Sequence, residues 1–467
     1  MHIIPQSWSH LHMLVSVFPS FGLLFVLGFY VSGLYWDNKG LIRTCLLFFI
    51  GLALLALPTY LSGVRAVSAF SSTTKLARDT MNFHYQWGVT SLIVLILTGV
   101  IAAFELWRSY RTVASSRIVL RLVLGLAVVS LGLMIFADGW EINHSELQVT
   151  VVIPDVSTPP WWPHVHMIIN HFPTVGFVFA IAFLLIGLAT RNDLMTRGSL
   201  VLFVLCGLVG IPTYVSGTAT MWALTQPPKP EISKAVINSH RDMALLSLFG
   251  LAFTGAAAWI ELWRTKYFGF FSRTSLTLVL AFAIVTLGVM AETGHRGGQI
   301  NHPEIRVATE VLATDPEAGV TPWVETTMNN VVWFIPWQTV HFFGYCLIFG
   351  SVLALALRVF GFWKSMSFAA VHRLLMIGFL GVLMNVFSGM LMMLADSYRY
   401  IVGDMLFGPK MALITIGAAA VLYFSVSDRV WGLKAGEDAP MAAKWVAGFV
   451  LLAWTGVLVC GRLLPYI

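Results

Sequence analysis

Histidines occur at matched positions along this chain, and their spacing is the clearest sign of chemistry in it. His12 and His166 lie 154 residues apart, each inside a Trp-x-His-x-His-Met segment. His84 and His240 lie 156 residues apart, so the same arrangement occurs twice. Neutral imidazole is a common ligand of haem iron, copper and zinc. The candidate cofactor-binding residues are His12, His84, His144, His166, His171, His240 and His302.

Three interpretations of these histidines are open. Two imidazoles that face each other inside a helical bundle can be the axial ligands of a haem b. The axial candidates are His12, His84, His166, His171 and His240. The pairs His10-x-His12 and His164-x-His166 have a spacing that suits copper or zinc. Alternatively, the histidines are hydrogen-bonded residues of the interfacial belt, with no cofactor. The chain lacks Cys-x-x-Cys-His, which gives no support to a covalent c-type haem.

The elements that carry these histidines are predicted to be transmembrane helices. The 467 residues are 58% hydrophobic and 11% charged, and the mean hydropathy is +0.80, whereas a soluble domain has about 25% charged residues. A helix needs about 20 apolar residues to cross a bilayer. Twelve such segments are predicted, near 13–34, 42–63, 85–106, 117–137, 168–190, 198–220, 242–263, 273–292, 341–361, 371–394, 409–427 and 443–463. The fold class is therefore an all-α integral membrane protein of about twelve spans.

Basic residues predict the orientation of these spans. Most of the 28 Lys and Arg residues fall in the short loops after the odd-numbered spans, which are expected to be cytoplasmic. Both termini and the long loops are then periplasmic, and all histidines except His372 lie at or beyond the outer ends of spans. We expect His372 to be an interfacial anchor. The net charge of +6 is spread over short loops, so it indicates topology rather than nucleic-acid binding.

Internal repeats predict three four-helix bundle units. Pro58–Gly63 matches Pro212–Gly217, and Glu105–Arg108 matches Glu261–Arg264, where we expect structural ion pairs. Residues 1–150 and 151–320 are therefore interpreted as a parallel tandem duplication of four spans each. Residues 321–467 form a diverged third unit.

The third unit keeps only part of the pattern. Its segment Asn385–Gly389 resembles the Tyr-x-Ser-Gly end of the earlier second spans, and His341-Phe342 is matched with His171-Phe172. Lys410 opens its third span, where the earlier units have a histidine. Lys410 is interpreted as a snorkelling anchor, or as the partner of a propionate, quinone or lipid. Whether this unit binds a cofactor is open.

Two segments resemble known families. Asn170–Pro173, followed by Gly297–His302, resembles a widespread bacterial family of four-span membrane proteins, mostly of unknown function, with an N-H-F-P first span and a G-G-x-x-x-H tail. Some relatives are fused to or encoded beside cytochrome c domains, so the resemblance implies redox work and b-type haem. Lys410–Leu413 is similar to the K-M-A-L helix of another uncharacterised four-span family. The first unit departs from the pattern at Val17, which replaces the second histidine.

Together these features predict a bacterial inner-membrane subunit that resembles cytochrome b. It would hold more than one haem b and transfer electrons between a periplasmic cytochrome or oxidoreductase subunit and membrane quinone, within a larger complex. We interpret the chain as a non-catalytic electron-transfer subunit, since it has no nucleotide motif and no triad signature. The alternatives are a haem-free scaffold, a copper or zinc protein, and a transporter. The last is disfavoured by span centres that are nearly free of charge.

Overall fold

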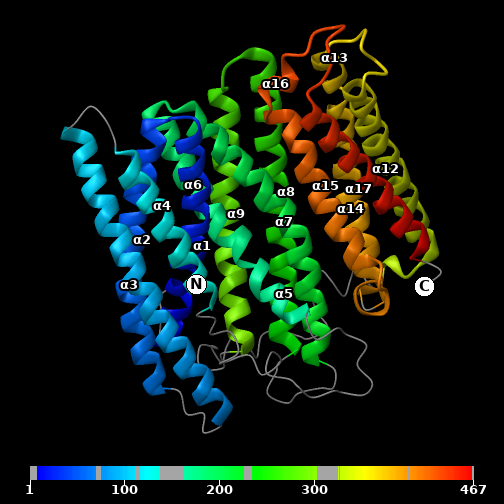
Figure 1. The fold of residues 1–467 in the computed structure, drawn as a ribbon. Helices are drawn as coiled ribbons and strands as arrows, with labels where there is room; N and C mark the ends of the chain where they lie inside the picture. Colours follow the sequence, from blue (N-terminus) through cyan, green and yellow to red (C-terminus); the bar gives the residue numbers. More distant parts are fainter. Residues whose placement is uncertain are drawn as a thin grey trace. The chain divides into compact units, whose positions relative to one another are not determined.

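Apolar runs of more than 20 residues produce long helices throughout the chain (Figure 1). The computed structural model describes residues 8–69, 75–111, 116–136, 162–225, 234–301, 324, 327–397 and 399–464. The helices are α1 (Trp8–Tyr35), α2 (Lys39–Ala69), α3 (Lys75–Arg111), α4 (Arg117–Phe136), α5 (Trp162–Ile169), α6 (His171–Thr190), α7 (Asp193–Thr225), α8 (Lys234–Phe268), α9 (Arg273–Asn301), α12 (Val331–Phe360), α13 (Phe368–His372), α14 (Leu375–Ala395), the π-helix η3 (Arg399–Gly403), α15 (Phe407–Val426), α16 (Asp428–Trp431) and α17 (Met441–Leu463).

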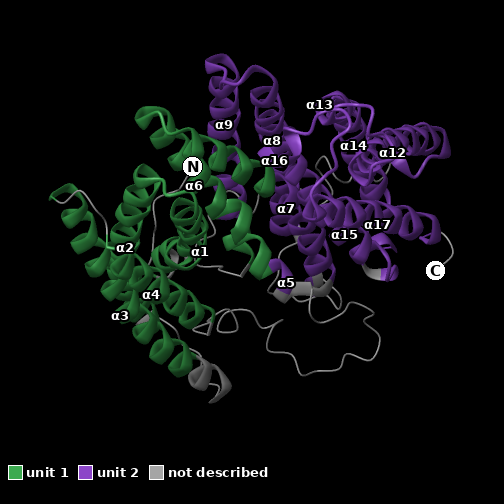
Figure 2. Cartoon of the chain, turned by 45° about the horizontal axis from the view of Figure 1, so that its top comes forward, with its two compact units in different colours: residues 1–152, 167–206, 297–307 green, residues 153–166, 207–296, 308–467 purple. Residues whose placement is uncertain are grey.

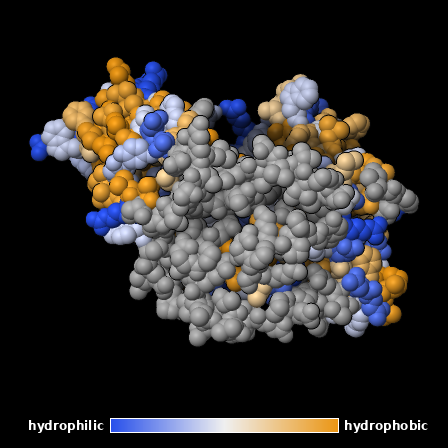
Figure 3. All heavy atoms as spheres, turned by 90° about the horizontal axis from the view of Figure 1, so that it is seen from below, coloured by the Kyte–Doolittle hydropathy of each residue, from blue (hydrophilic) through white to orange (hydrophobic). Residues whose placement is uncertain are grey.

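Twelve stretches of the described helices are long and apolar enough to cross a membrane. The predicted all-α class with about twelve spans is confirmed. Two spans contain a break: α5 and α6 form one, interrupted at Asn170, and α13 and α14 form another. Many exposed side chains on these helices are large and apolar, including Ile118, Val285 and Leu452. Seen end-on, hydrophobic atoms cover much of the described flanks (Figure 3). Such surfaces are stable only against lipid, so the chain is a multi-pass membrane protein in contact with lipid.

The chain divides into two compact units (Figure 2). The first comprises Met1–Val152, Met167–Cys206 and Gly297–Val307; the second comprises Ile153–His166, Gly207–Arg296 and Ala308–Ile467. Within the first, α1 packs on α2, α4 and α6, and α3 packs on α2 and α4. Within the second, α12 packs on α14 and α17, and α15 packs on α8 and α17. The division of the sequence at 1–150, 151–320 and 321–467 stays a prediction.

Reciprocal contacts between α1 and α6 reflect the internal repeat. A Cβ atom placed on Gly22 would lie 2.8 Å from the ring of Phe179. A Cβ atom placed on Gly176 would lie 2.7 Å from the ring of Phe25. The glycine of each repeat thus meets the phenylalanine of the other repeat. Reciprocal contact of this kind is what two copies related by a two-fold axis make, and it supports the parallel duplication.

The same symmetry continues to the ends of these two helices. Phe29 stacks on Phe183, 154 residues later, with ring centroids 3.8 Å apart. Asn38 and Asn192 donate hydrogen bonds to each other's side-chain oxygens, at 3.2 and 2.8 Å. Each oxygen also accepts the backbone N–H three residues ahead, at 2.9 and 3.1 Å. Asn38 therefore caps the start of α2 and Asn192 caps the start of α7, and the hydrogen bonds between the two side chains join the repeats.

Candidate histidine sites

His12 in α1 is held by the C-terminal part of α2. Its Nδ1 lies 3.0 Å from the carbonyl oxygen of Thr59 and 3.4 Å from the hydroxyl of Ser62. A carbonyl oxygen can only accept, so Nδ1 carries the proton and Nε2 keeps its lone pair. Ser62 donates its own hydroxyl to Thr59 O at 2.9 Å, which leaves its oxygen free to accept as well. This is the tautomer in which Nε2 can bind a metal.

His84 in α3 lies beside His12. The ring centroids are 6.3 Å apart and the ring planes are inclined by 80°. Burial lowers the pKa of His12 below its ordinary 6.5, and nearby His84 lowers it further, while the hydrogen bond to Thr59 opposes the shift. His12 is therefore neutral at pH 7, as a metal ligand must be.

His166 in α5 repeats the first arrangement. Its Nδ1 lies 3.1 Å from the carbonyl oxygen of Thr213 and 3.2 Å from the hydroxyl of Ser216. The same reasoning places the proton on Nδ1 of His166, so Nε2 is the nitrogen that carries the lone pair. The structure thus places His12 and His166 in equivalent surroundings, as the repeated sequence predicts.

A glycine beside each serine makes room for the ring. A Cβ atom placed on Gly63 would lie 2.8 Å from Cε1 of His12. A Cβ atom placed on Gly217 would lie 2.8 Å from Cε1 of His166. Real Cβ atoms do not approach this closely, so the Ser-Gly pair is a cradle in which serine binds the imidazole and glycine admits it.

His240 in α8 is oriented by a different helix. Its Nδ1 lies 3.0 Å from the carbonyl oxygen of Thr293 in α9. The hydroxyl groups of Thr293 and Ser247 share a hydrogen bond of 2.8 Å, which holds this part of α9 against α8. Because Nδ1 of His240 donates to this carbonyl, Nε2 of His240 is the nitrogen that keeps a lone pair.

The remaining candidate histidines are His171, His144 and His302. His171 begins α6, and its ring centroid lies 5.2 Å from that of Phe21 in α1. The structure therefore brings together His12 with His84, and holds His166 and His240 in the second compact unit. His144 and His302 lie outside the described residues, as do the side chains of His10 and His164.

Residues 321–467, the predicted third unit, also contain this cradle, and His341 is its histidine. Nδ1 of His341 lies 3.1 Å from the hydroxyl of Ser388. Ser388 donates its proton to Met384 O at 2.5 Å, so its oxygen must accept from the imidazole. A Cβ atom on Gly389 would lie 3.0 Å from Cε1 of His341. His341 therefore corresponds to His12 and His166, and the match with His171 was wrong.

His372 is not the interfacial anchor that its position suggested. Its side chain is fully buried, and its ring lies 4.9 Å from that of Trp431. Nε2 lies 3.5 Å from the hydroxyl of Ser425, which accepts the indole N–H of Trp259 at 2.9 Å. These contacts tie α8, α13, α15 and α16 together, so its role is in packing.

The C-terminal ends of α3 and α8 carry the ion pairs that the sequence predicts. Glu105 accepts two hydrogen bonds from Arg108, both at 2.9 Å, and Glu261 accepts two from Arg264, at 2.7 and 2.9 Å. Both carboxylates are fully buried, with 0% of the side chain exposed. Each also accepts a backbone N–H, from Ser116 or Ser272, just before the following helix. The structural role predicted for these pairs is confirmed.

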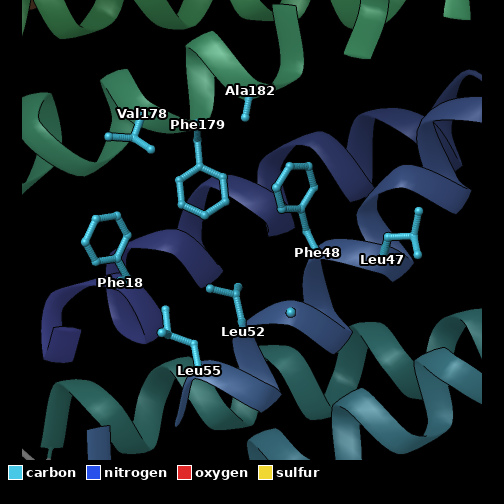
Figure 4. A pocket seen from close by; sticks show the side chains of 9 residues that line it. Phe18, Leu47, Phe48, Leu52, Leu55, Val178, Phe179 and Ala182 are labelled. Atoms are coloured by element: carbon cyan, nitrogen blue, oxygen red, sulfur yellow. The ribbon is translucent and has the colours of Figure 1, made fainter. Parts of the chain in front are cut away.

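One recess in the first compact unit has a purely apolar wall. It has a volume of about 230 Å³ and lies between α1, α2 and α6. Figure 4 shows the rings of Phe18, Phe48 and Phe179 around it, with Leu52 and Ala182. The lining offers no metal ligand, so this recess suits a hydrocarbon chain.

No protein-family model, curated protein sequence or solved structure matches this chain. Within the described part of the chain, no three His, Cys, Asp or Glu side chains converge as a metal site would require. A haem with two axial histidines needs only a pair of imidazoles. The pair His12 and His84 meets that requirement in ligand type, and His12 meets it in tautomer.

The sequence identified the histidines but not what holds them. The hydroxyls of Ser62, Ser216 and Ser388 and the carbonyls of Thr59 and Thr213 were missed as partners. For His12 and His166 the signal was the repeated Pro-Thr-Tyr-x-Ser-Gly segment, whose threonine and serine lie 47 and 50 residues after the histidine.

Proposed function

We propose that this protein is a b-type haem-binding membrane subunit that transfers electrons between a periplasmic redox partner and the quinone pool. The observation that carries the proposal is the repeated orientation of its outer histidines. In His12, His166 and His240 a backbone carbonyl oxygen holds Nδ1–H and leaves Nε2 as the donor to a metal. Histidine ligands of metals are usually held in this way by a second hydrogen bond.

His12 and His84 are the two imidazoles that would hold a haem in the first compact unit. The observed separation of the centroids is 6.3 Å.

The residues around the imidazoles would orient the ligands and keep them neutral. The Thr59 and Thr213 carbonyls prevent rotation of the rings, and burial keeps the His12 imidazole unprotonated. A bound haem b would supply one-electron chemistry. Because two histidine ligands leave no open iron position, electron transfer is favoured over oxygen chemistry, and any substrate reaction belongs to a partner subunit.

The location follows from the same proposal. Twelve spans return the chain to the side on which it started, and basic residues at the opposite ends favour the cytoplasmic side there. The histidines would then lie at the periplasmic face of a bacterial inner membrane, within reach of a periplasmic cytochrome or oxidoreductase subunit.

The test is a reduced-minus-oxidised absorption spectrum of protein purified from its native membrane, with a pyridine haemochrome assay. A b-type spectrum is expected, and His12→Ala, His84→Ala and His240→Ala should each lower the haem content. His372→Gln is the matched control, because this histidine lies at the inner end and the amide can still bond Ser425.

A flat spectrum from the intact complex would reject haem binding. Metal analysis of the same sample would then separate the copper or zinc alternative from a cofactor-free scaffold. Haem that is retained at full stoichiometry in all three outer-histidine variants would reject these residues as ligands.

A further inference from the structure

The third unit has the histidine cradle but lacks the second histidine. His341 is held by Ser388 and Gly389 with its Nδ1 proton donated, as in the two earlier repeats. Its Nε2 is thus an acceptor that needs a donor. Nothing in the cradle supplies one, because the serine is already the acceptor of Nδ1–H.

Lys410 occupies the place that His84 and His240 have in the earlier repeats. It lies in the first turn of α15, and its Cε and Nζ are 3.6 Å from a Cβ atom placed on Gly461 of α17. The end of the side chain therefore lies against α17 at Gly461. No hydrogen bond or ion pair joins its ammonium to any described residue. The side chain is half-buried and the carboxylate of Asp404 attracts its charge, so the ammonium keeps N–H groups with which it can donate to a ligand.

The two groups lie close to the same helix. Tyr345, one turn after His341, donates its hydroxyl to Trp454 O in α17 at 2.7 Å. Gly461, two turns further along α17, is the residue that Lys410 touches. The ammonium is near enough for its charge to act on the His341 ring. An acceptor nitrogen and a donor cation therefore lie on neighbouring helices that both pack against α17.

We propose that His341 and Lys410 bind the head group of a membrane quinol or quinone. A quinol hydroxyl can donate to Nε2 of His341, and the ammonium of Lys410 can donate to the oxygen on the opposite side of the ring. The isoprenoid chain would lie in the lipid. This inference rests on the proposed function, for which quinone is one of the two redox partners.

The chemistry of the site disfavours two other occupants. A bis-histidine haem needs a second imidazole, which the third unit does not offer at this position. A lipid phosphate would satisfy Lys410, but at neutral pH it has only acceptor oxygens and cannot donate to the lone pair of His341. A quinol supplies both a donor and an acceptor, and it is already dissolved in the membrane.

The test uses a photoreactive azido-quinone on the full-length protein in liposomes, with the labelled peptides identified by mass spectrometry. Label is expected on peptides of α12 and α15 and should be displaced by unlabelled quinol. Lys410→Met and His341→Gln should each weaken the displacement about tenfold to a hundredfold, as for lost hydrogen bonds to a charged or buried group. Lys410→Arg keeps the donor and should retain most of the binding.

Lys444→Met is the matched control, because this lysine of α17 pairs with Asp438 at the other end of the helix. Label confined to other helices, or affinity unchanged in both variants, would overturn the inference. So would a loss of haem in His341→Ala, which would make the third unit a haem site. Haem content measured on the same samples separates the two proposals: quinone labelling without haem supports only this one, and haem without labelling of α12 and α15 supports only the other.

Discussion

Replacing Gly217 with alanine tests whether the Ser-Gly cradle positions the imidazole. The new methyl group would start 2.8 Å from Cε1 and 3.2 Å from Nδ1 of His166. The ring must move by several tenths of an ångström, and that movement pulls Nδ1 away from Thr213 O. Overpacking costs about 1–3 kcal/mol, the weakened hydrogen bond about 0.5–1.5 kcal/mol, and the gain in helix propensity returns about 1 kcal/mol. The net loss of stability is therefore about 0.5–3.5 kcal/mol.

The matched control is Gly288→Ala in α9. A Cβ atom there meets nothing within 4 Å, so the substitution should be neutral or stabilise the helix by up to about 1 kcal/mol. Both variants can be compared by thermal unfolding in detergent with a thiol-reactive dye. Cys45, Cys206 and Cys460 are buried and report unfolding, and Cys346→Ser removes the exposed thiol.

The expected result is a lower unfolding temperature for Gly217→Ala than for Gly288→Ala. Haem content should fall in the first variant only, because only that substitution displaces a proposed ligand. If both variants unfold at the same temperature, the close approach of His166 to α7 is refuted. In that case, glycine would not be needed after the serine of the cradle to make room for the imidazole.

Three further outcomes are expected. Glu261→Gln should destabilise the protein by about 2–4 kcal/mol, because it removes the charge that pairs with Arg264 in a buried site. The loss stays below that of a fully buried pair because 21% of the Arg264 side chain is exposed. Chemical denaturation in detergent measures the loss, and a neutral effect would contradict it. Burial lowers the pKa of His12 below 6.5, so the unfolded chain binds a proton at a higher pH than the folded protein does. The free energy of unfolding should therefore fall as the pH drops below 6.5. Unfolding of wild type and His12→Gln at several pH values tests this, and equal pH profiles would contradict it. Asn38→Ala and Asn192→Ala should each lower the free energy of unfolding by about 0.5–2 kcal/mol. In a double-mutant cycle the two losses should differ from additivity by at least about 0.5 kcal/mol. Strict additivity would show that their mutual hydrogen bonds are unimportant.

The spans could be predicted from the sequence because lipid imposes a single requirement on each. A run of about 20 apolar residues suffices to identify a crossing, and all twelve runs are found as helices. The helix bounds were harder to predict. The third span was expected near 85–106, whereas α3 covers Lys75–Arg111. Helical hydrogen bonding continues into the polar headgroup region, where hydropathy no longer distinguishes helix from loop.

The site could be predicted only where the repeat is regular. His12 and His166 lie 50 residues before Ser62 and Ser216, but His341 lies 47 residues before Ser388. Matching by the local His-Phe pair therefore gave the wrong register in the third unit. The relevant constraint is the contact with the second helix, which depends on the length of chain between the two helices. Sequence alone does not show which contact preserves the register.

His372 shows the other limit of sequence reasoning. Its neighbour Arg373 and its place at a span end suggested an exposed anchor. Its actual surroundings come from Tyr267, Ser425 and Trp431, which are between 53 and 105 residues away. Packing between helices distant in sequence decides burial, and hydropathy of one segment contains no information about it.

The three cradles differ in the group offered by the third span rather than in the histidine itself. Each cradle fixes one imidazole by a serine hydroxyl beside a glycine, with the same tautomer. The third span then offers His84, His240 or Lys410. A constant imidazole with a second imidazole suits a metal centre, and a constant imidazole with an ammonium suits an organic ligand that both donates and accepts. Under the two proposals, one duplicated framework would thus hold both the electron carrier and the quinone with which it exchanges electrons, and the third-span residue would decide which of them binds.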